Sequence, residues 1–299
     1  MIPLVSSVCY GPLNLCQLPR TWWKISLNSA GCLDNEYPEC GGVLDLKVLQ
    51  VLGLRSEAVV AFVHEERPDY LSFEKWVAEN SSGVSKSDAE KWNESVRIRV
   101  HRQEKLDDIY GTLGGAVCFN EEAVTSAMVL NRLEDWHLYC LRDIDASPVK
   151  YWQGKVVPLI SSLDTGPMGV LQIARTWHKV QLETAGLLHH DYPGCGNGLD
   201  RRVIEEALGL DRDQVVDYLT SANPGYLEFE RWIREQLGGR DVSESVTEFH
   251  HFLEGRIHAD EKRAEIHATL ERNDDGSWMK GVLLNHLEDW HLAHAQLYR

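Results

Sequence analysis

The octapeptide NRLEDWHL at residues 131–138 recurs as NHLEDWHL at residues 285–292. Outward from this pair, the likeness continues along the chain in both directions with a nearly constant register. Similarity over so long a period indicates a duplicated domain. Because the join is short, we expect the two repeats to pack together as a pseudo-twofold dimer. The expected boundaries are a first repeat at 1–145, a linker at 146–156 and a second repeat at 157–299.

Each repeat carries the signals of helices rather than strands. Arg20 begins a helix that Gly31 can end. The pattern Ser87-x-x-Glu90 is a capping box, which predicts a long helix through Lys105. No stretch alternates apolar and polar residues with a period of two. We predict an all-α or mostly α fold of two tandem homologous helical domains, each with a short extended N-terminal arm.

The composition is that of a globular protein with an acidic surface. Of the 299 residues, 43% are hydrophobic and 25% are charged. Asp and Glu number 46 against 30 Lys and Arg, which gives a formal net charge of −16. Such a surface repels phosphate groups, so nucleic acids and anionic membranes are poor partners. We expect a monomer or weak homodimer whose partner is a small-molecule substrate.

Apolar runs and cysteines indicate the compartment. No apolar run approaches the roughly 18 residues that cross a bilayer. The apolar start of the chain resembles a signal peptide, but its pattern recurs from Val157, where no signal peptide would be read. Only Cys40 and Cys195 of the seven cysteines match between the repeats, whereas a disulfide framework would repeat with the domain. We therefore predict a soluble cytoplasmic protein with reduced thiols.

Residues shared by the repeats resemble a bacterial family of unknown function that usually occurs in single copies. The pattern is a Pro-Arg-x-x-x-Lys helix, then a loop with Tyr and Gly, then Asp. The matching residues are Pro19, Arg20, Lys24, Tyr37, Gly41 and Asp45 in the first repeat, and Arg175, Lys179, Tyr192, Gly196 and Asp200 in the second. Ala174 stands where the family has proline, a departure that concerns only the start of that helix. The resemblance covers nearly the whole chain and implies no activity.

The repeated octapeptide is the first candidate for chemistry. On a helix that turns about 100° per residue, Glu134 and His137 share a face, and so do Glu288 and His291. Helical di-metal proteins supply ligands from such Glu-x-x-His pairs. Alternatively, the carboxylate orients the imidazole, which acts as an acid or base near neutral pH, or the pair belongs to a buried polar network. The same spacing, with its order reversed, recurs in His101-x-x-Glu104 and His258-x-x-Glu261.

A second candidate is a pair of basic residues on one helix face. Arg20 and Lys24 are four residues apart, as are Arg175 and Lys179, and both pairs are suited to bind a carboxylate or phosphate group. The alternative interpretation is an ion pair with Asp45 or Asp135 of the same domain.

The remaining candidates are thiols, histidines and indoles. Cys40 and Cys195 lie in Gly-rich loops, where a thiol is either a nucleophile with a lowered pKa or a small buried apolar group. Ten of the 13 histidines lie in the second repeat, where His178 replaces Trp23. The recurring Trp residues are typical of a core.

Three functions remain open. The first is a cofactor-independent enzyme of lyase, isomerase or cyclase type that acts by acid–base chemistry on a small anionic organic molecule. Its candidate catalytic residues are His291, Glu288, His258, Glu261, His137, Glu134 and Tyr192, and its candidate substrate-binding residues are Arg175, Lys179, Arg20, Lys24, Trp177 and His178. The second is a metal-dependent helical-bundle enzyme with the ligands His258, Glu261, Glu288 and His291.

The third function is that of a non-catalytic small-molecule-binding or scaffold protein. No nucleotide, flavin or serine-hydrolase motif is present in the sequence. No cofactor is therefore predicted, with a divalent metal as the alternative.

Overall fold

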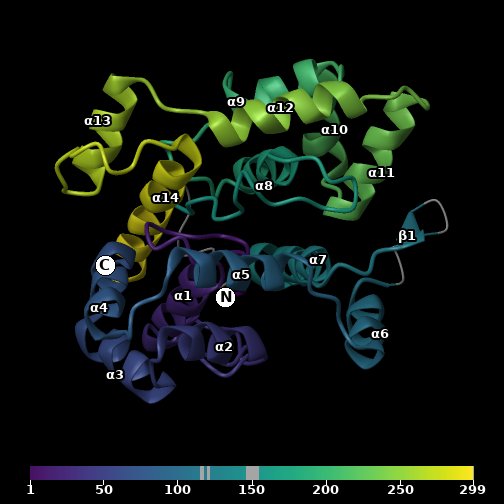
Figure 1. The fold of residues 1–299 in the computed structure, drawn as a ribbon. Coiled ribbons are helices and arrows are strands. Elements are labelled where there is room, and N and C mark those ends of the chain that lie inside the picture. Colours follow the sequence, from purple (N-terminus) through teal and green to yellow (C-terminus); the bar gives the residue numbers. More distant parts are fainter. Residues whose placement is uncertain (115–117, 120–121, 146–154, 299) are drawn as a thin grey trace. The chain divides into compact units, whose positions relative to one another are not determined.

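The computed structural model describes residues 1–114, 118–119, 122–145 and 155–298, and the chain is helical, as the sequence predicts (Figure 1). Within these ranges the only strands are β1 (Cys118–Phe119) and β2 (Glu122–Ala123), which pair antiparallel. A search of the described helices finds none with the length and apolar character needed to cross a bilayer.

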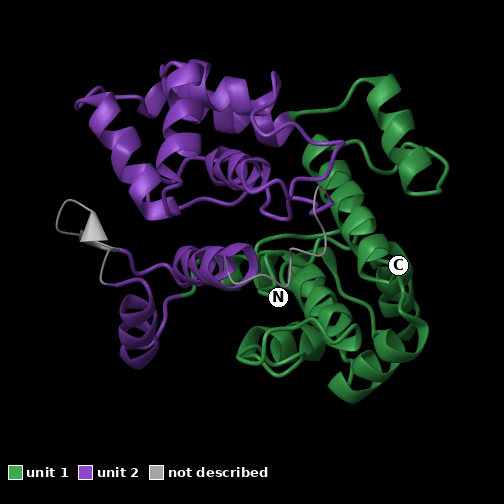
Figure 2. Cartoon of the chain, turned by 180° about the vertical axis from the view of Figure 1, so that it is seen from behind, with its two compact units in different colours: residues 1–99, 256–299 green, residues 100–255 purple. Residues whose placement is uncertain are grey.

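The chain divides into two compact units whose boundaries differ from those of the repeats. Unit 1 contains residues 1–99 and 256–299, and unit 2 contains residues 100–255 (Figure 2). Each unit therefore joins the larger part of one repeat to the last helices of the other. These units do not coincide with the two repeats expected at 1–145 and 157–299, whose boundaries stay a prediction, and residues 146–154 of the expected linker lie outside the described residues. The packing of whole repeats as a pseudo-twofold dimer stays a prediction.

The physical reason for the exchange is the likeness of the repeats. The last helices of either repeat carry the same apolar face, so they meet an equivalent surface on either set of partner helices. Exchange of an identical element therefore costs little free energy. The covalent order of the chain does not decide which pairing forms.

Unit 1 is made of the first five helices and the last two. Its helices are α1 (Leu18–Ser29), α2 (Val43–Leu52), α3 (Ser56–Glu66), α4 (Tyr70–Asn80), α5 (Lys86–Arg97), α13 (Asp260–Thr269) and α14 (Gly281–Leu297). Helix α14, which carries the second octapeptide, packs on α4 and on α13, while α1 packs on α3 and α4.

Unit 2 repeats this arrangement with the other copy of each element. Its helices are α6 (Gln103–Thr112), α7 (Ala127–Tyr139), η1 (Cys140–Asp145), α8 (Ile173–Thr184), α9 (Leu199–Arg201), η3 (Arg202–Ala207), α10 (Arg212–Ala222), α11 (Tyr226–Leu237) and α12 (Ser243–Gly255). Helix α7, which carries the first octapeptide, packs on α11 and α6 as α14 packs on α4 and α13. Both η1 and η3 are π-helical.

The helix predicted from Ser87 through Lys105 is two helices in the structure. Ser85, not Ser87, caps α5, and its hydroxyl oxygen accepts a hydrogen bond from the Asp88 amide at 3.1 Å. The helix ends at Arg97, and α6 begins only at Gln103. The chain passes from unit 1 to unit 2 in this gap, which the capping pattern alone does not reveal.

An arm of irregular backbone, interrupted by turns, precedes α1 and α8. Arg20 donates hydrogen bonds to the carbonyl oxygens of Pro3 and Val5 at 2.6 and 2.9 Å. Arg175 holds the second arm in the same way, through the carbonyl oxygens of Pro158 and Ile160. Each guanidinium group thus supplies donors for two carbonyl oxygens of its arm, which satisfies polar backbone groups that no helix or strand pairs.

Each arm passes close to a buried Tyr–Glu pair at a glycine. A Cβ atom on Gly166 would lie 2.3 Å from both Glu230 Oε1 and Tyr226 Cε1. A Cβ atom on Gly11 would likewise lie 2.3 Å from Tyr70 Cε1. Only glycine fits such an approach, which explains the repeated Gly-Pro in the arms.

Candidate functional site

The predicted basic pairs belong to the buried frame of each unit. Lys179 forms an ion pair with Asp200, and Lys24 forms one with Asp45 at 2.5 Å. All four side chains are at least nine-tenths buried. The ion-pair interpretation with Asp45 is therefore confirmed, and the lysine of each predicted anion clamp is committed to a carboxylate of the protein.

The two aspartates are also the centres of identical hydrogen-bond networks. Asp200 accepts hydrogen bonds from Gln172 Nε2, Thr176 Oγ1 and the Gly196 amide at 2.7–2.8 Å. Burial raises the pKa of Asp200, but the charge of Lys179 and these hydrogen bonds outweigh it and lower the pKa below its ordinary value. Asp45 accepts the equivalent bonds from Gln17, Thr21 and Gly42.

The glutamates of the octapeptides face lysines rather than their own histidines. Glu134 pairs with Lys105 at 3.2 Å, and Glu288 pairs with Lys262 at 3.4 Å. Burial raises the pKa of both carboxyl groups. Among the described residues no hydrogen bond joins either glutamate to the histidine three residues later, so the structure does not show the predicted orienting contact.

The first residue of each octapeptide, Asn131 or Asn285, contacts a histidine. From the sequence, the same histidine was expected to pair with the glutamate three residues after it. His258 Nε2 lies 2.7 Å from Asn285 Oδ1, and His101 Nε2 lies 2.7 Å from Asn131 Oδ1. Glu261, which shares the spacing of a ligand pair with His258, is exposed. These contacts join the segment just before α13 to α14 and the segment just before α6 to α7, and they are typical of a structural network.

His291 and His137, which occupy the same position in the two octapeptides, have different surroundings. In unit 1, His291 Nδ1 lies 3.7 Å from Asp69 Oδ2, and this contact contributes to lowering the pKa of Asp69, against the opposing effect of its burial. In unit 2 the counterpart of Asp69 is Gly225. The half-buried ring of His137 makes no hydrogen bond or ion pair with any described residue, and burial lowers its pKa.

His137 lines a pocket within unit 2. The pocket has a volume of about 330 Å³, near the lower end of the range for small-molecule sites. It is lined by Leu113, Leu133, Trp136, His137, Cys140, Leu141, Ile144, Asp145, Trp177, Gln181, Asn223, Pro224, Gly225, Tyr226, Leu227 and Glu228. Both repeats contribute, through α7 and η1 of the first and through α8 and the start of α11 of the second.

Three aromatic rings form one wall of this pocket. Tyr226 packs edge-on against Trp136 and Trp177, with ring centroids 4.6 and 5.3 Å apart. The Trp177 indole donates a hydrogen bond to the Pro224 carbonyl oxygen at 3.0 Å. At the rim, Leu141 is 50% exposed.

A second hollow lies in unit 1, and it contains none of the predicted site residues. Its volume is about 380 Å³, and its lining is Val51, Gly83, Val84, Asp88, Lys91 and Trp92. The pocket of unit 2 is therefore the better candidate.

Trp177 and His178, predicted together as binding residues, separate in the structure. Trp177 lines the pocket. His178 is fully buried beside Tyr139, with ring centroids 5.4 Å apart, and burial together with the nearby charge of Arg175 lowers its pKa to about 3. His178 is therefore a neutral core residue.

Tyr192 and the loop thiols lie outside the pocket lining. The ring of Tyr192 lies under the Arg175 guanidinium, 6.0 Å from its centroid. Burial raises the pKa of the Cys195 thiol, and burial and the nearby Asp45 raise the pKa of Cys40 to about 12. A raised pKa disfavours the thiolate, so the nucleophile interpretation finds no support here.

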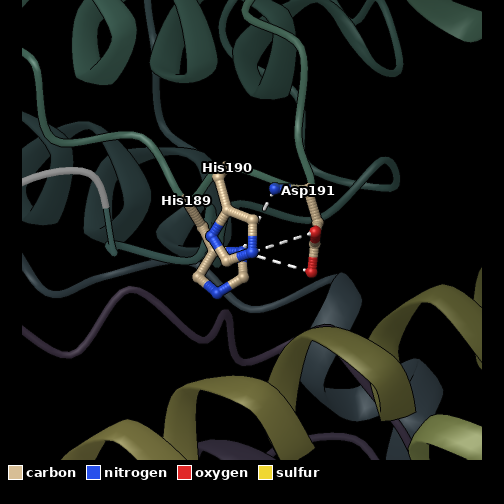
Figure 3. A group of neighbouring side chains, drawn as sticks. All are labelled: His189, His190 and Asp191. Atoms are coloured by element: carbon tan, nitrogen blue, oxygen red, sulfur yellow. Dashed lines mark hydrogen bonds and ion pairs between the residues drawn. The ribbon is translucent and has the colours of Figure 1, made fainter.

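One cluster has the composition of a metal site, but it is not the predicted one. Figure 3 shows His189, His190 and Asp191, whose candidate ligand atoms lie within 4.8 Å of one another. Within the described ranges no other group of three or more His, Cys, Asp or Glu meets this criterion, so His258, Glu261, Glu288 and His291 do not form one. Two of the three members of the observed cluster are exposed.

Comparison with known proteins adds no assignment. No protein-family model matches the chain, and no curated protein or solved structure is significantly similar to it. The resemblance inferred from the sequence therefore stays a prediction.

Proposed function

We propose that the pocket of unit 2 binds a small organic molecule and that His137 transfers a proton to or from it. The observation that carries this proposal is the environment of His137, an imidazole that lines a pocket and has no partner among the described residues. Because burial lowers its pKa, the ring is neutral at pH 7 and available as a base. The reaction class is that of a lyase, isomerase or cyclase, in which a proton is removed and returned.

The charges of the pocket favour an uncharged or cationic ligand. Among the residues that the structure describes, the lining contains no Lys or Arg, whereas Asp145 and Glu228 contribute two carboxylates. Arg175, the predicted anion-binding residue, donates instead to the carbonyl oxygens of Pro158 and Ile160. The anionic substrate expected from the sequence therefore finds less support than a neutral molecule or an amine.

Hydrogen–deuterium exchange at carbon tests the proton transfer directly, whatever the final product of the reaction. The protein is incubated in D₂O with pooled small amines and neutral ring compounds, and the molecules retained after ultrafiltration are analysed by mass spectrometry. We expect at least one retained compound to take up deuterium at carbon. In His137→Gln the same compound should be retained but should exchange about 100-fold more slowly, since a positioned base contributes that much.

A matched control is His251→Gln, which removes an exposed histidine of the same unit that is not part of the pocket lining. Its exchange rate should equal that of the wild type. If no compound is retained by the wild type, the binding proposal is wrong. If compounds are retained but exchange equally slowly with the wild type and His137→Gln, the chain binds without catalysing proton transfer.

A further inference from the structure

The two units differ at several positions that line the pocket of unit 2. The octapeptides place α7 and α14 in register, and the sequences around Pro68 and Pro224 place the other wall in register. Written from unit 1 to unit 2, the replacements are His294 by Cys140, Tyr298 by Ile144, Arg67 by Asn223 and Ser26 by Gln181. All four unit 2 residues line the pocket.

In unit 1 the corresponding place is filled by side chains of the chain itself. The His294 ring stacks on Trp22, the counterpart of Trp177, with centroids 5.6 Å apart and planes 29° apart. Tyr298 packs edge-on against His294 at 4.9 Å. Its hydroxyl donates a hydrogen bond to the carbonyl oxygen of Ser26 at 3.0 Å, and the Arg67 guanidinium lies 5.2 Å from its ring centroid.

The side chains that occupy this place in unit 1, His294 and Tyr298, therefore indicate the shape and chemistry of a molecule that would fit the unit 2 pocket. A planar ring lies on the indole that both units share, and a hydroxylated ring beside it donates a hydrogen bond at the position of Gln181. In unit 2 the filler positions carry Cys140 and Ile144, which are smaller and have no ring, while the indole of Trp177 remains. Unit 2 thus keeps the indole but lacks the two rings that pack there in unit 1, which indicates that a separate molecule of similar chemistry binds in their place.

We infer that the ligand of the unit 2 pocket is an aromatic amine or phenol whose ring packs on Trp177 and whose hydroxyl or amino group donates a hydrogen bond at Gln181. This inference rests on the proposed function, because it concerns the same pocket. Charge supports the amine: Asn223 replaces the cation Arg67, and Glu228 replaces the neutral Ser72. A cationic group also gains from the faces of Trp and Tyr rings within its reach.

Isothermal titration with three related probes tests the ligand class. Tyramine carries both a phenol and an ammonium group, 4-hydroxyphenylacetate replaces the ammonium with a carboxylate, and 2-cyclohexylethylamine keeps the ammonium without an aromatic ring. We expect tyramine to bind at one site. The other two should bind at least about 10-fold more weakly, since each loses one favourable interaction.

Reciprocal exchange of residues between the units locates the site. Cys140→His with Ile144→Tyr installs the fillers of unit 1 in unit 2 and should abolish tyramine binding. Arg67→Asn with His294→Cys and Tyr298→Ile installs the residues of unit 2 in unit 1 and should raise the number of sites from one to two. Every substitution brings in the residue that the other repeat carries at that position, and Asn suits the left-handed backbone of Arg67, whose φ is 46°.

Circular dichroism and the thermal midpoint check that each variant folds. If the triple variant does not fold, His294→Cys alone, which removes the ring stacked on Trp22, should still allow weak binding of tyramine in unit 1. The inference is wrong if tyramine does not bind, if it binds equally to the filled variant, or if the opened variants gain no site. If 2-cyclohexylethylamine binds best and the filled variant excludes it, the aromatic class fails while the pocket and the proposed function stand.

Discussion

Replacement of Asp200 by alanine is expected to lower the free energy of unfolding of unit 2 by about 3–5 kcal/mol. The substitution leaves the ammonium group of Lys179 buried without its carboxylate, and it removes the acceptor of three further hydrogen bonds. A buried charge without a partner costs far more than the loss of an exposed ion pair. Urea unfolding followed by tryptophan fluorescence and circular dichroism measures the change.

Two comparisons separate the buried pair from a general effect of charge. Glu206→Ala removes an ion pair with Arg202 that is about half exposed, and it should cost less than about 1 kcal/mol. The double variant Lys179→Met with Asp200→Leu removes both charges and should be more stable than Asp200→Ala, because no unpaired charge remains. A loss below about 1 kcal/mol for Asp200→Ala would contradict the assignment.

The residues of the buried polar networks could be identified from the sequence, because residues that the core requires are retained in both repeats. Arg175, Lys179 and Asp200 recur with their partners in the first repeat, and each lies in a buried network of unit 2. Helix caps and the absence of a period of two were enough for the all-α class. The exchange of the last helices could not be predicted. These helices can pack on their own repeat or on the other repeat, and the two surfaces have similar sequences, so the two arrangements have similar energies.

The site could be predicted only in part, for a related reason. His137 and Trp177 were expected to be functional, and both line the pocket. Residues retained in both repeats, such as Glu134 and Lys179, lie in structural ion pairs. The pocket instead arises where the repeats differ, at positions such as Cys140 and Gly225. A small residue in a sequence does not reveal whether a cavity lies next to it.

For the same reason, the number of histidines in a repeat does not indicate where the pocket lies. None of the histidines of the second repeat is among the described residues that line the pocket, and His294 occupies the corresponding place in unit 1. A histidine is bulky enough to fill a hollow as well as reactive enough to serve in one. The sequence shows the residue type but not which of these roles it has, because that depends on the volume left by its neighbours.

Relative to the wild type, Glu230→Gln is expected to gain about 3 kcal/mol in the stability of unit 2 as the pH rises from about 4.5 to about 8. Glu230 is fully buried, and it accepts hydrogen bonds from the Tyr226 hydroxyl at 2.7 Å and the Met168 amide at 3.0 Å. Burial raises its pKa from 4.5 to about 7, although these hydrogen bonds and the nearby Arg234 oppose the shift. Glutamine keeps one of the two oxygen acceptors, which lowers its stability by the same amount at every pH, and it never ionises, so it avoids burying a negative charge.

The sign of the pH dependence follows from proton linkage. A carboxyl group with a raised pKa contributes its full stability below its ordinary pKa of 4.5, and that stability is lost as the pH rises through about 7. The stability difference between Glu230→Gln and the wild type should therefore grow between about pH 4.5 and pH 7 and stay constant above about pH 8. Other titrating groups are common to both proteins and cancel in the difference, which urea unfolding measures at each pH.

The equivalent glutamate of unit 1 provides an independent repetition. Glu74 is also buried and binds the Tyr70 hydroxyl and the Leu13 amide, and burial raises its pKa to about 7. Glu74→Gln should therefore give the same curve for unit 1, and the two substitutions together should add, because they lie in different units. A stability difference that does not vary with pH would show that these carboxyl groups titrate with the same pKa in the folded and the unfolded chain, which contradicts a pKa raised by burial.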